Sequence, residues 1–178
     1  MIRFVVTALL SLVFAGSSFA EPNWTLKKGD NPALFAFTRA FKSNLNIEII
    51  GFACEDSNGI KAIQLQIYTK GGGPLAPSGV SRRQLKDEPR AQLLVDGRDF
   101  PVALDFAGEY ALLTSHVEGV FPVLSDDIMK VVESGKTLTL RFDLRKKQSN
   151  AGEFDSEAVV ELTGGAAAIV AVRRRCAK

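Results

Sequence analysis

The sequence predicts a mainly β protein, an antiparallel β-sandwich or a curved sheet with one or two short helices, stapled by a disulfide. Two observations predict the sheets: short segments in which apolar and polar residues alternate, and tight-turn signals such as Asn58-Gly59 and Asp96-Gly97 between them. A third observation predicts the disulfide. The chain has 2 cysteines, Cys54 and Cys176, and it begins with the pattern of an export signal.

Residues 1–20 are predicted to be a signal peptide. Arg3 precedes an apolar run that extends to Gly16, and Ser18-Phe19-Ala20 supplies the small residues of a cleavage site. The run is too short to span a membrane comfortably, so we expect cleavage after Ala20 and no stable membrane span. The protein is then expected in the periplasm or secreted, with residues 21–178 as a single β-rich exported domain.

The first half of this domain is predicted to consist of strands and turns. Trp24 is expected to plug the edge of the core. The apolar spacing over residues 34–41 fits either a strand or a helix. Residues 45–54 and 60–69 read as the two strands of a hairpin, and the first is apolar on both faces, which is typical of a central strand. Residues 71–89 are predicted to form a mobile surface loop.

Two further strands and a short helix are predicted next. Residues 100–106 are expected to lead out of the Asp96-Gly97 turn as one strand, and residues 110–114 form another. A helix over Ser125–Ser134 is predicted, with the Ser125 hydroxyl as its N-cap. Gly135 is expected to end it in the left-handed conformation.

The closing stretch is predicted to contain two strands and a second helix. Residues 137–144 and 154–163 alternate in hydrophobicity and are expected to pair antiparallel, because their short polar link has no room for a crossover helix. Residues 166–175 then favour a helix that carries Cys176, since an alanine run has high helix propensity. A strand over residues 168–173 is the alternative.

Several features form a pattern together: an early Trp24, a strand that ends in Cys54, the hairpin at Val95-Asp96-Gly97, and a late helix that ends in Cys176. The C-terminal run adds to it with Phe154, Leu162-Thr163-Gly164 and Ala168-Ile169. This pattern resembles the small periplasmic proteins of the invasion-associated locus B type and the related accessory proteins of type VI secretion. The resemblance covers most of the mature chain and departs at residues 71–90. It implies a β-rich exported domain with this disulfide and no established catalytic residues.

The sequence offers little for catalysis. The only histidine is His116. It lies beside Ser115, but no Gly-x-Ser-x-Gly elbow accompanies the pair. His116 and Glu118 would share one face of a strand, whereas metal sites usually have three or four ligands. We therefore expect no catalytic residues, no metal and no cofactor. An envelope hydrolase that uses His116 is the alternative function, and an inhibitor of an envelope hydrolase is another.

The preferred function is a non-catalytic binding or accessory protein of the bacterial cell envelope. The candidate partner-binding residues are the basic side chains of the region 71–90, together with the neighbouring tyrosine: Tyr68, Arg82, Arg83 and Arg90. A basic surface suits an envelope protein or an anionic envelope component. The formal net charge of +2 gives no nucleic-acid footprint. The alternative is a solvated loop with no dedicated partner.

Overall fold

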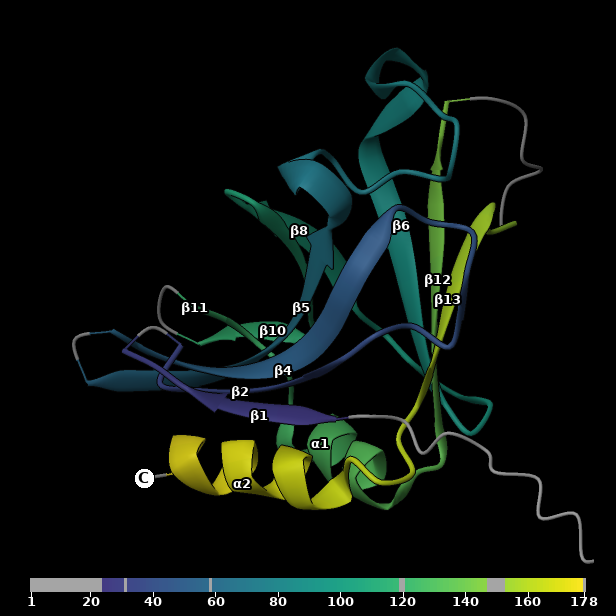
Figure 1. Ribbon diagram of the computed structural model, residues 1–178. Coiled ribbons are helices and arrows are strands. Elements are labelled where there is room, and N and C mark those ends of the chain that lie inside the picture. Colours follow the sequence, from purple (N-terminus) through teal and green to yellow (C-terminus); the bar gives the residue numbers. More distant parts are fainter. Residues whose placement is uncertain (1–23, 31, 58, 119–120, 147–152, 178) are drawn as a thin grey trace, which may run out of the picture.

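The computed structural model describes residues 24–30, 32–57, 59–118, 121–146 and 153–177. The predicted signal peptide and its cleavage site lie outside these residues. Two antiparallel sheets form the body of the molecule, the first with strand order β1-β2-β4-β5-β9-β8 and the second with order β3-β13-β12-β6-β7. The first sheet is visibly curved, and two helices lie against one end (Figure 1). The predicted fold class is confirmed.

The strands of the first sheet are β1 (Thr25–Lys28), β2 (Leu34–Thr38), β4 (Ile47–Ser57), β5 (Ile60–Thr69), β8 (Ala103–Ala107) and β9 (Tyr110–Thr114). The strands of the second sheet are β3 (Lys42–Ser43), β6 (Leu85–Val95), β7 (Arg98–Phe100), β12 (Thr137–Arg145) and β13 (Ser156–Glu161). A separate small hairpin consists of β10 (His116–Glu118) and β11 (Phe121–Val123). Short 3-10 turns are η1 (Lys70–Gly72) and η2 (Arg82–Gln84).

Most of the predicted local elements are present. The hairpins at Gly59 and Asp96-Gly97 join β4 to β5 and β6 to β7, and Asp96 and Gly97 both have positive φ angles, of 50° and 81°. The predicted pairing of the two late strands is confirmed by β12 and β13. Residues 34–38, for which a helix was the alternative, form the strand β2. The strand β4 is central, with β2 and β5 on its two sides.

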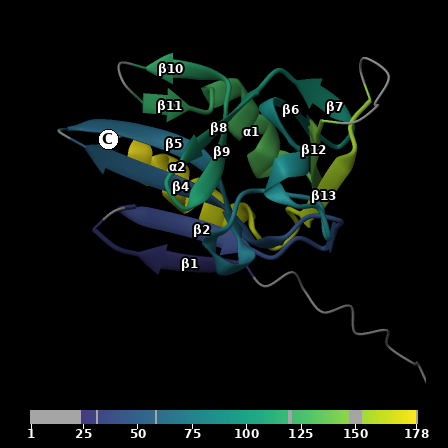
Figure 2. The same cartoon turned by 90° about the horizontal axis from the view of Figure 1, so that it is seen from above.

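The two helices are also confirmed. In α1 (Asp126–Ser134), the Ser125 Oγ accepts a hydrogen bond from the Ile128 N–H at 3.3 Å. The second helix, α2 (Ala166–Cys176), runs along the first sheet on the face opposite the viewer in Figure 2. Cys176 is bonded to Cys54 of β4, with a Cα–Cα distance of 5.5 Å. The predicted disulfide therefore fastens α2 to a central strand.

Gly135 departs from its predicted role. Its φ of −75° and ψ of 164° are extended rather than left-handed. A Cβ at this position would lie 2.5 Å from Val95 Cγ1 and 3.0 Å from the Val131 carbonyl oxygen. Glycine is suited to this position because it lets the end of α1 approach β6 closely, and not because of a positive φ angle.

The predicted loop over residues 71–89 ends earlier than expected. Residues 85–89 are the first part of β6, in which Leu85 pairs with Arg145 of β12. The part before them is packed, since Leu75 is only 2% exposed. The Asn46 side chain holds it in place by accepting from the Ala76 N–H at 2.9 Å and donating to the Pro74 carbonyl at 2.9 Å.

The predicted strand over residues 100–106 is divided between the two sheets. Phe100 ends β7 in the second sheet, and Ala103 begins β8 in the first. Pro101 and Val102 make the crossing, and Pro101 has no N–H with which to continue a ladder. The chain thus ties the two sheets together at this point.

The core lies between the sheets and beneath α2. Trp24 closes one edge of it, as predicted: its Nε1 donates to the Glu161 carbonyl of β13 at 2.9 Å, and its ring stacks on Phe52 of β4 at 6.2 Å. The side chains that are completely enclosed come from both sheets and both helices, among them Ile50, Phe52, Leu65, Ile67, Leu113, Met129, Leu138, Leu140, Phe142 and Ile169. Neither described helix has the length and apolarity needed to cross a membrane.

A testable packing constraint lies on the outer face of the first sheet. A Cβ on Gly51 would lie 2.5 Å from Phe35 Cε2 and 2.6 Å from the Ala36 carbonyl oxygen. We expect Gly51→Ala to lower the free energy of unfolding by about 2 kcal/mol, because the overpacked site must shift backbone as well as side chain. Urea unfolding measures this loss. Gly73→Ala is the control, since a Cβ there meets nothing within 4 Å, and an equal loss in both variants would contradict the explanation.

Candidate functional site

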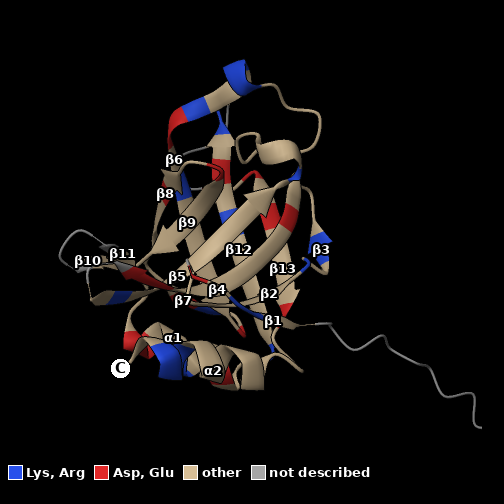
Figure 3. Ribbon diagram, turned by 60° about the vertical axis from the view of Figure 1, so that its left-hand side comes forward, with Lys and Arg blue, Asp and Glu red and all other residues tan. Residues whose placement is uncertain are grey.

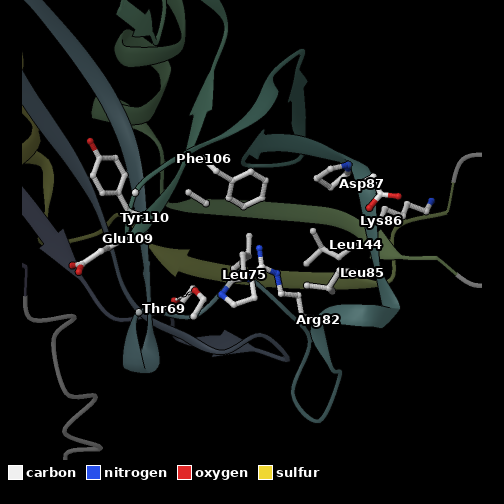
Figure 4. A pocket seen from close by; sticks show the side chains of 16 residues that line it. Thr69, Leu75, Arg82, Leu85, Lys86, Asp87, Phe106, Glu109, Tyr110 and Leu144 are labelled. Atoms are coloured by element: carbon white, nitrogen blue, oxygen red, sulfur yellow. Dashed lines mark hydrogen bonds between the residues drawn. The ribbon is translucent and has the colours of Figure 1, made fainter.

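A pocket of about 500 Å³ opens between the two sheets (Figure 4). It is lined by parts of β6 and β8 that lie away from the two helices in Figure 1. Its apolar walls include Leu75, Leu85 and Leu144. Phe106 of β8 also lines it and is 50% exposed, so an apolar ring faces the opening. The rim carries charged and polar groups from three segments: Thr69, Arg82, Lys86, Asp87, Glu109 and Tyr110.

The pocket exists because two strands diverge. β8 and β6 separate toward the top of Figure 1, after the crossing at Pro101 has placed them in different sheets. A register shift in β12 between Asp143 and Arg145, where it pairs with β6, adds a local irregularity next to the pocket. The turn η2 then places Arg82 over the opening, and its side chain points into the pocket in Figure 4.

The charges near this opening are mixed rather than uniformly basic. The chain runs from the basic Arg82 and Arg83 of η2 through Lys86 to acidic residues in β6. Figure 3 shows basic and then acidic segments following one another at the top of the molecule, leading into β6. Asp87 is one of these acidic residues, and its carboxylate lies 3.3 Å from Lys146 Nζ. The prediction of a basic surface therefore applies to η2 and not to the whole of residues 71–90.

Asp143 beside the pocket is a buried carboxylate with two cationic partners. Its side chain is 0% exposed, with Lys86 Nζ at 2.5 Å and Arg90 Nη2 at 2.6 Å. Burial by itself raises the pKa of this carboxyl group, but the hydrogen bonds and charges of Lys86 and Arg90 outweigh burial and hold the pKa below its usual value. The carboxylate thus keeps both cations at fixed positions along β6.

The four predicted partner-binding residues are not gathered in one site. Arg82 lines the pocket, whereas Arg83 is exposed and does not line it. Arg90 is engaged with Asp143, and its guanidinium lies 5.8 Å from the centre of the Phe154 ring. Tyr68 is on the outer face of the first sheet, where its ring is 5.2 Å from that of Tyr110 on the pocket rim.

Tyr68 has a structural role in a polar network. Its hydroxyl donates to Gln66 Oε1 at 2.9 Å, and Gln66 Nε2 in turn donates to Glu55 Oε1 at 2.6 Å and Gln64 Oε1 at 3.0 Å. Burial, and secondarily the neighbouring Tyr110, Glu55 and Glu109, raise the pKa of Tyr68 to about 12. The phenol therefore stays protonated at neutral pH and remains a donor.

Sequence reasoning missed most of the residues that line the pocket. Phe106 and Glu109 come from the β8–β9 hairpin, and Lys86 and Leu85 from a segment read as a loop. A sequence signal was present only for Phe106, as an apolar residue at the end of an alternating run next to the turn at Gly108. No local pattern indicates that these two segments meet.

His116 lies apart from this pocket. Its Nδ1 is 3.0 Å from the Ser115 Oγ. The Ser115 Oγ accepts a hydrogen bond from the Ser125 N–H at 2.8 Å. Ser115 thereby fixes the start of the segment that enters α1. The hydrogen bonds of the described side chains include none between His116 and a carboxylate. Within the same residues, no group of three or more His, Cys, Asp or Glu side chains is placed to hold a metal ion.

The fold and the pocket together define a disulfide-linked β-sandwich with one open end. No protein-family model matches the chain, and no curated protein or solved structure matches it either. The resemblance to the invasion-associated locus B type and to type VI secretion accessory proteins therefore stays a prediction.

Proposed function

We propose that this protein is a non-catalytic binding or accessory protein of the bacterial cell envelope, which holds a partner at the open end of its sandwich. The observation that carries the proposal is the pocket, with accessible apolar side chains at Leu85 and Phe106 and a charged rim. Binding sites commonly combine an apolar lining with a few convergent polar groups. The disulfide supports an oxidising compartment such as the periplasm or the exterior of the cell.

Arg82 is the rim cation that is available to a partner. Lys86, the other basic side chain of the lining, is already paired with Asp143. Among the described residues Arg82 forms no ion pair, and it points into the pocket (Figure 4). A guanidinium in this position favours a carboxylate or phosphate, which it can bind through two parallel hydrogen bonds. The proposed partner therefore presents an anionic group.

Adjacent arginines allow a matched test of this proposal. We expect Arg82→Ala to reduce capture of the partner from an envelope extract about tenfold, because a hydrogen bond to a charged group contributes about 1.5–3 kcal/mol. Arg83→Ala removes the same charge from the next residue, which does not line the pocket, and should leave capture unchanged. Immobilised wild-type and variant proteins, followed by mass spectrometry and lipid analysis of the bound material, give the comparison.

Two results would contradict the proposal. The first is equal capture by Arg82→Ala and Arg83→Ala, which would mean that the pocket is not the binding site. The second is turnover of an envelope substrate that His116→Ala abolishes while the fold is kept, which would favour the hydrolase alternative.

A further inference from the structure

One strand beside the pocket has an unpaired edge. β8 is the last strand of the first sheet. Ala107 and Tyr110 flank a two-residue turn and face each other in the register of β8 with β9, so they form a hydrogen-bonded pair. Alternation then turns the backbone groups of Leu104 and Phe106 away from β9. These groups lie on the free side of β8, next to the pocket.

The Phe106 N–H on this edge is already occupied. It donates to the carboxylate of its own neighbour, Asp105, at 2.8 Å. The described residues provide no backbone hydrogen bond to Leu104 outside the β8–β9 pair. A strand added at this edge can therefore hydrogen bond to the N–H and C=O of Leu104 and to the C=O of Phe106. The Phe106 N–H is not available, because the Asp105 carboxylate already accepts from it. Such devices limit unselective pairing of an exposed edge.

The facing strand, β6, is unsuited to accept a partner strand. Its residues 93–95 pair with β7, whereas residues 85–92 have no strand on that side. The register of β6 with β12 shifts between Arg90 and Leu85, so the regular alternation of its backbone groups is interrupted beside the pocket. Residue 89 is a proline and has no N–H to donate. Of the two strand edges that border the pocket, only β8 can form a regular ladder.

We propose that the partner is an extended peptide segment with an acidic side chain, which adds to the free edge of β8 and fills the pocket. This inference rests on the proposed function and specifies the partner class. The peptide backbone pairs with Leu104 and Phe106, while every second side chain enters the space beside Leu85 and the exposed Phe106 ring. Its acidic side chain lies against Arg82, which points into the same space (Figure 4).

The peptide backbone provides the decisive test, because it can be altered without changing the protein. The probe is a library of synthetic ten-residue peptides in which apolar residues alternate with polar ones and one residue is Glu. Binding to the disulfide-bonded wild-type protein is measured by fluorescence polarisation, and the best peptide is then N-methylated at one residue at a time. We expect methylation to weaken binding at least about tenfold at every second residue near the centre and to have little effect at the residues between, since an edge ladder uses alternate N–H groups.

Two further measurements test which backbone groups of β8 pair with the peptide and whether Arg82 binds its acidic side chain. Amide hydrogen exchange at Leu104 should slow when the peptide is bound, because its N–H enters the ladder. Arg82→Ala should weaken the Glu peptide about tenfold or more and leave the corresponding Gln peptide nearly unchanged. Arg83→Ala should affect neither peptide.

The outcomes separate this inference from the proposed function. The peptide inference is overturned if no library peptide binds, if N-methylation has no alternating effect, or if phosphatidylglycerol vesicles or palmitate bind through Arg82 while peptides do not. The proposed function survives each of these if Arg82-dependent capture from envelope extract persists. Loss of that capture together with absence of peptide binding defeats both.

Discussion

Replacing Cys54 and Cys176 by alanine together is expected to lower the free energy of unfolding by about 2–5 kcal/mol. The bond closes a separation of 122 residues, for which the chain-entropy model gives about 5 kcal/mol. The bond joins the last turn of α2 to β4. The other contacts that keep α2 in place include the buried side chains of Ile169 and Val172 and the ion pair of Arg173 with Glu133 at 3.0 Å. Loss of the bond should therefore loosen α2 first.

Urea unfolding of the double alanine variant measures this effect, and limited proteolysis locates it. Cleavage should appear in residues 166–177 before the sheets unfold. The reduced wild-type protein is the control and should lose a similar amount of stability without any substitution. A change below about 1 kcal/mol in both proteins would mean that helix packing alone holds α2 in place.

The second large effect is expected for Asp143→Asn, which should cost about 3 kcal/mol. Removing one partner of a buried ion pair leaves charges without compensation and typically costs 3–5 kcal/mol. The lower end applies here because the side chains of Lys86 and Arg90 are 27% and 53% exposed and can regain water. Asp87→Asn is the matched control, since the Asp87 side chain is 91% exposed in its pair with Lys146. It should change stability by less than about 0.5 kcal/mol.

The Asp143 carboxylate also predicts how stability varies with pH. Its pKa is lower in the folded protein than its ordinary value of 3.8, so the unfolded chain takes up the proton first as pH falls. The stabilisation is then fully present well above pH 3.8, and it is lost as the pH falls through that value and through the lower folded pKa. Urea midpoints measured between pH 7 and pH 2 should fall less steeply below pH 4 for Asp143→Asn than for the wild type. Parallel curves for the two proteins would show that Asp143 does not cause the acid sensitivity.

Local sequence patterns predicted the hairpins, both helices and the disulfide, because each of these depends on neighbouring residues or on cysteine count. Asp96-Gly97 is an example: its two positive φ angles are a property of the turn itself. The first part of β6 could not be predicted this way. Lys86, Asp87, Glu88 and Pro89 hide the strand alternation. They lie between Arg90 and Leu85, which pair with Asp143 and Arg145 of the distant strand β12.

The candidate site was predictable only in part. Arg82 was identified from its charge, but Phe106 and Leu144 reach the same pocket through strand pairings that no short pattern reveals. Arg90 illustrates the opposite error. Its charge suggested a partner-binding residue, whereas the register of β6 with β12 places Asp143 directly across from it. The assignment of a charged residue to binding or to stability depends on that register.

The two-residue strand β3 has a consequence for the speed of folding. Ser43 of β3 pairs with Ala158 of β13 in the second sheet. The strands that precede and follow β3 along the chain, β2 and β4, both belong to the first sheet. The second sheet is thus completed only when segments more than a hundred residues apart along the chain have met. Closing such long loops costs entropy before any contact compensates for it, and proteins dominated by non-local strand pairing fold in milliseconds to seconds. The unpaired edge of β8 is exposed throughout that interval, when an intramolecular cap such as Asp105 protects the chain against pairing with other chains.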